Sequence, residues 1–203
     1  MNVLLIDDHP MVSSGLATIL EETGRFKVSG KVNSLAQAKK FFNARKKILP
    51  SLVILDILLG EENGLDFLPF LESYCTDKKI QKPHVLVCSV MEDPLRIQSA
   101  LKMGASGYIP KTGGKKELLE AIEVIMRGEV YLSGKQSEKL WKSNGLYEKF
   151  TKRELEIFSL IKEKKTNKQI ADILGLNFRT VENHVSNIYF KTGAADREEL
   201  LKL

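Results

Sequence analysis

Four short apolar runs in the N-terminal part of the chain each lead toward a polar or charged side chain. The groups that follow these runs are Asp7 and Asp8, Asp56, Ser89 and Lys111. Apolar residues at helical spacing separate the runs, and this alternation predicts parallel strands joined by helices. Parallel strands place their carboxyl ends at one edge of the sheet, where open α/β folds bind ligands. We therefore expect three carboxylates, a hydroxyl and an ammonium to converge at that edge.

The predicted N-terminal fold is α/β, a five-stranded doubly wound parallel sheet with five helices. Its strands are expected at residues 3–6, 26–32, 52–55, 85–88 and 107–109. Residues 52–55 are entirely apolar, which is typical of a central parallel strand. Pro69 lies inside the helical pattern of residues 64–74 and indicates a kink or a late helix start.

The helical pattern changes after residue 125. Apolar periodicity fades over residues 126–148, which we interpret as a linker with a short helical stretch at 136–141. Periodicity returns at Phe150, and the remainder predicts four helices, at 152–162, 167–174, 178–192 and 196–203. A chain of 203 residues can bury two modest cores. We therefore expect a first domain at 1–125, the linker, and a small all-α domain at 149–203.

Charge, cysteine content and hydropathy narrow the class of protein. The net charge is +5, and residues 149–203 hold 11 basic against 8 acidic side chains, a surplus that only permits nucleic acid as a partner. Cys75 and Cys88 belong to no Cys-x-x-Cys pair or Cys/His cluster, which favours a reduced cytoplasmic setting. Apolar stretches stay far below the roughly 18 residues of a membrane span, and no secretion signal is evident. We expect a cytoplasmic protein with no membrane partner.

The strand-end groups suit phosphoryl transfer to an aspartate. Two anions repel, so such a site needs a divalent cation, a fixed ammonium and a hydroxyl to share the charge. Oxygen ligands favour Mg²⁺. Taken singly, an aspartate after a strand is as often a helix cap or turn former. His9, His84 and Cys88 are interpreted as structural, because no second ligand type lies at metal-binding spacing.

Longer motifs surround these groups. In chain order they are Ile6-Asp7-Asp8-His9-Pro10, then Asp56 with Asn63-Gly64-Leu65 downstream, Ser89, and Gly107-Tyr108-Ile109-Pro110-Lys111. Together they resemble the receiver domain of two-component response regulators. The resemblance implies that Asp56 is the phosphoacceptor. It also implies that Mg²⁺ is held by Asp7, Asp8, Asp56 and the backbone carbonyl of Leu58.

The resemblance implies roles for three further residues. Ser89 and Lys111 would bind the incoming phosphoryl oxygens, and Tyr108 would be an aromatic switch that moves inward when the hydroxyl is drawn to the phosphate. Three positions depart from the family pattern. Gly60 replaces a proline in the loop after the acceptor, Val90 replaces a small residue, and the proline near Lys111 precedes the lysine at Pro110 instead of following it. None of these removes a reactive group.

The C-terminal helices contain a pattern typical of a helix-turn-helix. Residues 167–174 and 178–192 form two helical segments, joined by a turn at Gly175-Leu176 and with Asn177 as the expected cap of the second. On pattern alone an ordinary αα-hairpin is the commoner structure. The motifs that favour DNA binding are Phe150-Thr151-Lys152-Arg153-Glu154-Leu155-Glu156, Thr166-Asn167-Lys168-Gln169-Ile170-Ala171, Arg179-Thr180-Val181-Glu182-Asn183-His184 and Asn187-Ile188-Tyr189-Phe190-Lys191-Thr192-Gly193. They resemble the LuxR-type DNA-binding domain.

A chain that combines a receiver with this C-terminal domain is similar to the NarL/FixJ-type response regulators. That resemblance implies a set of DNA-binding side chains. Those placed to face base edges are Glu182, Asn183 and Ser186, and those placed for phosphates are Lys168, Arg179, Thr180, Asn187 and Lys191. The carboxylate of Glu182 could accept from cytosine N4 or instead pair with a neighbouring lysine.

The resemblance predicts a phosphoacceptor transcription regulator rather than an enzyme. Its expected partners are a histidine kinase, double-stranded DNA, a second copy of the chain on activation and, as a candidate, RNA polymerase. Two rivals stay open. One is a receiver that regulates DNA binding without phosphorylation, because Gly60, Val90 and Pro110 depart from the pattern. The other is an aspartate-dependent phosphatase, although such enzymes favour Asp-x-Asp after the first strand, whereas here Asp7 and Asp8 are adjacent.

Overall fold

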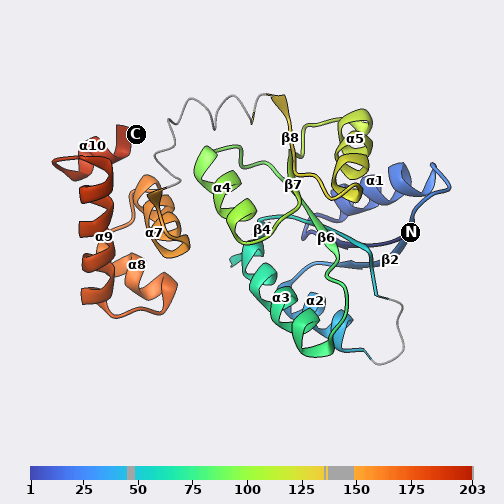
Figure 1. The fold of residues 1–203 in the computed structure, drawn as a ribbon, viewed down its shortest axis with the longest axis horizontal. Coiled ribbons are helices and arrows are strands. Elements are labelled where there is room, and N and C mark those ends of the chain that lie inside the picture. The colour runs from blue at the N-terminus through green and yellow to red at the C-terminus, as the bar shows by residue number, and fades with distance from the viewer. Residues whose placement is uncertain (45–48, 135, 137–148, 203) are drawn as a thin grey trace. The chain divides into compact units, whose positions relative to one another are not determined.

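The fold comes from a computed structural model that describes residues 1–44, 49–134, 136 and 149–202. Contacts divide the chain into two compact units, residues 1–92 with 100–134 and residues 93–99 with 135–203. The helical stretch predicted at 136–141 lies outside the described residues except for Gln136. No helix of the described part is long and apolar enough to cross a membrane. Figure 1 shows the ribbon of both units.

The N-terminal unit is built on a parallel sheet. Its strands are β1 (Asn2–Ile6), β2 (Lys27–Val32), β3 (Leu52–Leu55), β6 (His84–Ser89), β7 (Gly107–Pro110) and β8 (Tyr131–Leu132). Their order is β2-β1-β3-β6-β7-β8, with every neighbouring pair parallel. The first five strands follow the 2-1-3-4-5 order of a flavodoxin-like sheet. The predicted doubly wound parallel sheet is therefore confirmed.

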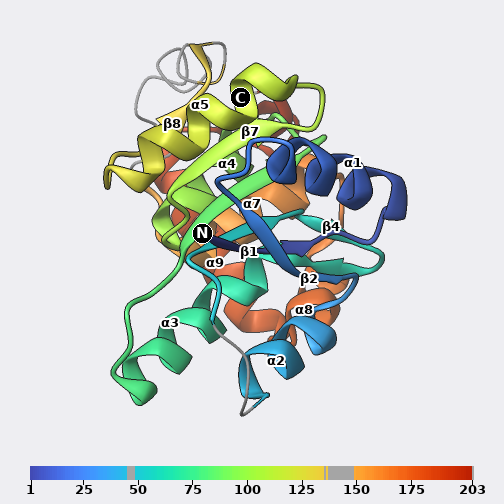
Figure 2. The same cartoon turned by 90° about the vertical axis from the view of Figure 1, so that its right-hand side faces the viewer.

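Helices cover both faces of this sheet. They are α1 (Pro10–Glu21), α2 (Leu35–Asn43), α3 (Phe67–Lys78) and α5 (Lys115–Met126). Helix α4 (Pro94–Lys102) follows β6, and its residues 94–99 belong to the second compact unit. Figures 1 and 2 show α1 and α5 on one face and α2 and α3 on the other. Alternate residues of β1 divide accordingly, because side chains alternate along a strand. Val3 and Leu5 pack with the buried apolar residues of α1 and α5.

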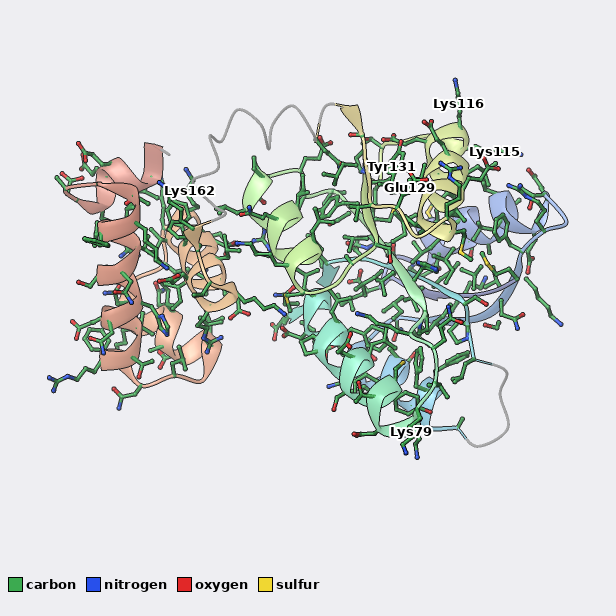
Figure 3. The ribbon with its side chains drawn as sticks, viewed as in Figure 1. Lys79, Lys115, Lys116, Glu129, Tyr131 and Lys162 are labelled. Atoms are coloured by element: carbon green, nitrogen blue, oxygen red, sulfur yellow. The ribbon has the colours of Figure 1, made fainter. Side chains whose placement is uncertain are left out.

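The sheet has a sixth strand that the sequence analysis did not predict. Strand β8 is only two residues long and lies in the segment expected to be a linker. It pairs with β7, where Gly107 faces Tyr131. A Cβ atom at Gly107 would lie 3.0 Å from the Tyr131 backbone oxygen, so the missing side chain permits this close pairing. Figure 3 labels Tyr131 beside α5, whose core it extends.

Two local features lie after β3. Residues 58–63 form a hairpin, β4 (Leu58–Leu59) with β5 (Glu62–Asn63), which was not predicted. Gly60 takes a positive φ of 62° in its turn, a conformation that glycine adopts without steric cost. A 3₁₀ turn at Gly64–Asp66 then precedes α3. Helix α3 begins only at Phe67, so Pro69 falls in its first turn and the late start is confirmed.

The C-terminal unit contains four described helices with strong sequence-encoded ends. They are α7 (Lys152–Lys162), α8 (Asn167–Leu174), α9 (Phe178–Thr192) and α10 (Arg197–Lys202). Thr151 and Thr166 begin α7 and α8 with capping boxes, in which side chain and backbone exchange hydrogen bonds. Gly175 ends α8 in a left-handed conformation, and the Asn177 side chain caps α9 as predicted. Their inward faces share one buried apolar core.

Candidate phosphoacceptor site and nucleic-acid interface

Three aspartates meet at the carboxyl ends of two neighbouring strands. Asp7 and Asp8 follow β1, and Asp56 follows β3, which pairs with β1. One potential ligand atom from each of these residues and from His9 lies within 4.8 Å of the others. The predicted convergence of the acidic residues therefore occurs, and His9, interpreted as structural, also borders the cluster.

Lys111 supplies the cation of this cluster. Its Nζ atom lies 2.6 Å from Asp56 Oδ2 and 2.8 Å from Asp7 Oδ2. Burial lowers the pKa of Lys111, but the hydrogen bonds and charges of Asp56 and Asp7 outweigh it, and the net pKa is raised. The ammonium thus stays charged at neutral pH. This one ammonium lies within ion-pair distance of both carboxylates.

Backbone groups fix the orientation of each carboxylate. The His9 amide donates to Asp7 Oδ1 at 2.8 Å, and the Leu58 amide donates to Asp56 Oδ1 at 3.2 Å. The Gly60 amide donates to Asp8 Oδ2 at 2.9 Å, which ties the hairpin to the acidic cluster. The Asp56 side chain is 2% exposed. The Asp56 carboxylate is therefore enclosed and held in a fixed orientation.

The same cluster has oxygens suited to a hard cation. Asp7 Oδ2 and Asp8 Oδ1 are buried and make no hydrogen bond of acceptable geometry among the described residues. Each instead faces a nitrogen, Lys111 Nζ at 2.8 Å and His9 Nδ1 at 2.7 Å. Carboxylate oxygens gathered in this way are the hard ligands that Mg²⁺ prefers.

Gly64 allows the backbone of Asp56 and Ile57 to approach closely. A Cβ atom at this position would lie 1.9 Å from the backbone oxygen of Asp56, which no side chain can tolerate. The Gly64 amide also donates to the Ile57 carbonyl at 2.7 Å. Sequence analysis noted this glycine only within the Asn63-Gly64-Leu65 motif. Its role as a close-approach position that sets the Asp56 backbone emerges from the fold.

Ser89 and Tyr108 lie on the adjacent strands. Both are fully buried. The Ser89 Oγ accepts from the Met91 amide at 3.4 Å, and the Tyr108 hydroxyl donates to the Met91 carbonyl. The aromatic ring is therefore inside the protein. Met91, whose backbone contacts both predicted switch residues, was missed because a backbone acceptor has no sequence signal.

Val90 and Cys88 flank Ser89 in the sequence and differ in exposure. Val90 is 60% exposed, so most of its side chain is in contact with solvent. On the other side, burial raises the pKa of Cys88 to about 12, with further effects from the charges of Lys111 and Asp56. A thiol with this pKa stays protonated at neutral pH and is no nucleophile. Cys88 is thus a core residue, as interpreted.

The predicted DNA-binding residues gather on the helix-turn-helix formed by α8 and α9. Most of them are exposed: Lys168, Arg179, Glu182, Asn183, Ser186 and Asn187. Thr180 is half-buried. The opposite stripe of α9, Val181, Val185 and Ile188, is buried in the domain core. The second helix therefore presents a polar face to solvent, the arrangement with which such helices enter the major groove.

Lys191 differs from the others, because its ammonium has a partner inside the domain. Its Nζ lies 2.6 Å from Oε2 of Glu154, whose side chain is 3% exposed. Burial raises the pKa of Glu154, but hydrogen bonds from Lys191 and from Thr151 outweigh it, and the net pKa is lowered. The sequence analysis had placed Lys191 at DNA phosphates and had assigned no role to Glu154. A phosphate contact by Lys191 has to compete with this buried pair.

Comparison with known proteins accounts for both units. The family model of the response regulator receiver domain matches residues 3–123, and that of the bacterial regulatory proteins of the luxR family matches residues 148–203. The chain belongs to the LuxR-type response regulators. One family model matches the first part of the chain and the other matches the second part. Together they confirm the resemblance to NarL/FixJ-type regulators.

Similar response regulators extend the match over nearly the whole chain. The transcriptional regulatory protein LiaR of Bacillus subtilis (strain 168) is 31% identical over 206 residues, with 98% of this chain and 94% of LiaR covered. The response regulator protein VraR of Staphylococcus aureus (strain COL) is 29% identical over 203 residues, covering 98% and 93%. The family is therefore shown by sequence as well as by motif.

Solved structures share the fold of this response regulator. RcsB from Salmonella enterica serovar Typhimurium, bound to promoter rprA in the presence of phosphomimetic BeF3-, has a TM-score of 0.73 at 21% identity. The same protein bound to promoter P1flhDC, again with BeF3-, gives 0.74 at 20% identity. Each of the two alignments covers 100% of this chain and 96% of the RcsB chain. These structures support the predicted fold, a parallel α/β unit followed by an all-helical unit.

Proposed function

We propose that this response regulator accepts a phosphoryl group on Asp56 from a histidine kinase and thereby controls transcription through its helix-turn-helix. The observation that carries the proposal is the enclosed Asp56 carboxylate, 2.6 Å from the Lys111 ammonium and bordered by Asp7 and Asp8. An isolated surface aspartate would have neither a fixed cation nor neighbouring anions arranged for a metal.

The proposed reaction is a single phosphoryl transfer. A carboxylate oxygen of Asp56 attacks phosphorus as the phosphorus–nitrogen bond of the kinase phosphohistidine breaks, and the departing imidazole takes up a proton. The product is an acyl phosphate on Asp56. Lys111, already beside the acceptor, would pair with a phosphoryl oxygen, and the Ser89 hydroxyl would donate to another.

Asp7 and Asp8, with Asp56 and the Leu58 carbonyl, would hold Mg²⁺ at this site. The bound ion supplies charge neutralisation for the approaching phosphoryl oxygens. The chain contributes the arrangement: backbone amides of His9, Leu58 and Gly60 orient the three carboxylates before any ligand arrives. The burial of Asp56 excludes most bulk water from the acyl phosphate.

The switch would act through Ser89 and Tyr108. Both are tied to the backbone of Met91, so a phosphoryl group that draws the Ser89 hydroxyl toward Asp56 also changes the surroundings of the tyrosine ring. Such a change alters the balance between two conformations. A differential free energy of about 1.4 kcal/mol already shifts that balance tenfold.

The output would be binding of a dimer to double-stranded DNA with two half-sites. Two features favour it: α9 presents exposed polar residues, and Lys168 and Arg179 add exposed positive charge on the same two helices. The RcsB structures give a precedent, because one is described as two RcsB dimers bound to two parallel DNAs. A contact with RNA polymerase belongs to the proposal as a downstream partner.

Phosphorylation can be tested directly on the full chain. The protein is incubated with a small-molecule phosphodonor and Mg²⁺, and its intact mass is followed with time. We expect the mass of one phosphoryl group to be added, with Asp56→Asn as the unreactive control. Omission of Mg²⁺ is expected to slow the addition, which tests the metal assignment separately.

The outcomes separate the proposed function from its rivals. Sustained release of phosphate over many turnovers would indicate a phosphatase rather than a regulator. A chain that binds specific DNA but acquires no phosphoryl group would indicate a receiver that works without phosphorylation. The ion pair of Lys111 with Asp56 favours the phosphorylated form over this second reading, because the cation that would pair with a phosphoryl oxygen already lies beside the carboxylate.

A further inference from the structure

An aromatic ring stands on the polar face of α9. Phe190 is 89% exposed, and the sequence analysis assigned it no role. Each helical residue advances by about 100°, so the outward face opposite Val181, Val185 and Ile188 contains Arg179, Asn183, Ser186, Asn187 and Phe190. Phe190 is the one apolar member of that face.

The helix geometry places Phe190 in line with Asn183. The two are seven positions apart, which is nearly two whole turns and leaves an angular offset of about 20°. Along the axis the separation is about 10.5 Å at 1.5 Å per residue. A helix in the major groove follows the inclined groove, and zinc-finger helices contact three successive bases with residues −1, 3 and 6, a similar length of helix. If Asn183 reads a base edge, Phe190 therefore lies over the groove about two to three base pairs further on.

The chemistry of the ring narrows what it can contact there. A phenyl group cannot form a hydrogen bond with a base edge or pair with a phosphate. The apolar group that base pairs present in the major groove is the C5-methyl of thymine, and phenylalanine is among the side chains that contact it. The ring stands alone among polar and cationic neighbours, which suits DNA better than an apolar protein surface.

We propose that Phe190 is a specificity-determining residue that selects thymine about two to three base pairs from the base pair read by Asn183. This inference rests on the proposed DNA-binding function and extends it by naming the base. The ring would pack on the thymine methyl, while Arg179 and Lys168 supply the sequence-independent attraction to phosphates. Each half-site bound by a dimer would then hold one such thymine.

The test uses the full chain, treated with phosphodonor and Mg²⁺, and duplex DNA selected from a random library by the wild type. In the selected sequence each thymine is replaced in turn by deoxyuridine, which lacks only the methyl group. One position in each half-site is expected to lose affinity about fourfold in the wild type, the equivalent of about 0.8 kcal/mol per buried methyl. In Phe190→Ala the same replacement should cost nothing.

Phe178→Ala is the matched control. Phe178 is a second exposed phenylalanine at the start of α9, 47% exposed and about 120° around the helix from Phe190. This variant should keep the thymine sensitivity at the same position. Thermal unfolding of Phe190→Ala should match the wild type, because the ring is 89% exposed.

Two results would overturn the inference while leaving DNA binding intact. One is an equal deoxyuridine effect in the wild type and in Phe190→Ala at every thymine. The other is a selected sequence in which no thymine methyl contributes. By contrast, failure of the wild type to select any sequence would remove the proposed function itself.

Discussion

Replacement of Lys191 by methionine should destabilise the C-terminal helices even when no DNA is present. The substitution removes the ammonium that lies 2.6 Å from Glu154 and leaves a carboxylate with a 3% exposed side chain. Loss of one partner from a buried ion pair costs about 3–5 kcal/mol. Lys191 itself is 27% exposed, and solvent screening reduces the expected loss to about 2–3 kcal/mol.

The loss is not larger because Glu154 keeps other partners. Its Oε2 also accepts from the Thr151 amide at 2.7 Å, in the capping box that begins α7. A double variant, Glu154→Gln with Lys191→Met, removes both charges and retains a side-chain oxygen for the cap. It should recover much of the stability lost in the single variant, because no uncompensated charge is left buried.

Hydrogen exchange followed by mass spectrometry measures this effect in the full chain. Peptides from α7 and α9 should exchange on the order of 30- to 140-fold faster in Lys191→Met, since about 1.4 kcal/mol corresponds to a tenfold change. Lys168→Met, which replaces an exposed lysine on α8, is the matched control and should leave exchange unchanged. Wild-type exchange in Lys191→Met, or no recovery in the double variant, would refute the reasoning.

Three further predictions concern other positions. Gly64→Ala should shift the Asp56 backbone, because the added Cβ would lie 1.9 Å from the Asp56 carbonyl oxygen. Phosphorylation, followed by intact mass, should slow, and the free energy of unfolding, measured by thermal unfolding, should fall by about 1–3 kcal/mol. Lys168→Ala should weaken binding to all duplexes and reduce the slope of log affinity against log salt by about one, whereas an unchanged slope would contradict a phosphate contact. The lowered pKa of Glu154 contributes stability that is present above the ordinary carboxyl pKa of 4.5 and is lost as the pH falls through the lower folded value. In Glu154→Gln the stability of α7, measured by hydrogen exchange, should therefore depend less on pH in the acid range than in the wild type.

The groups with local signals were predictable from the sequence. Asp7 and Asp56 follow apolar runs, and parallel strands deliver such positions to one edge of a sheet. The Asn177 cap and the late start of α3 at Pro69 follow from side-chain and ring geometry that acts within a few residues. These predictions required no knowledge of distant contacts, which explains why they hold.

The features that were missed depend on tertiary contacts. Strand β8 is two residues long and forms because Gly107 lets Tyr131 approach. The ion pair of Lys191 with Glu154 joins α9 to α7 across 37 positions of sequence. No local pattern distinguishes a lysine that faces a buried carboxylate from one that faces solvent. The resemblance implied a phosphate contact for Lys191, and the fold shows that its ammonium also has an internal partner, Glu154.

The central claim is that phosphorylation of Asp56 controls DNA binding, and one comparison tests it most directly. The affinity for a selected duplex is measured for the wild type and for Asp56→Asn, each with and without the phosphodonor and Mg²⁺. We expect the donor to increase wild-type affinity by about tenfold or more, the equivalent of about 1.4 kcal/mol, and to leave the variant unchanged. Equal affinities of wild type and variant in the presence of the donor would contradict the claim.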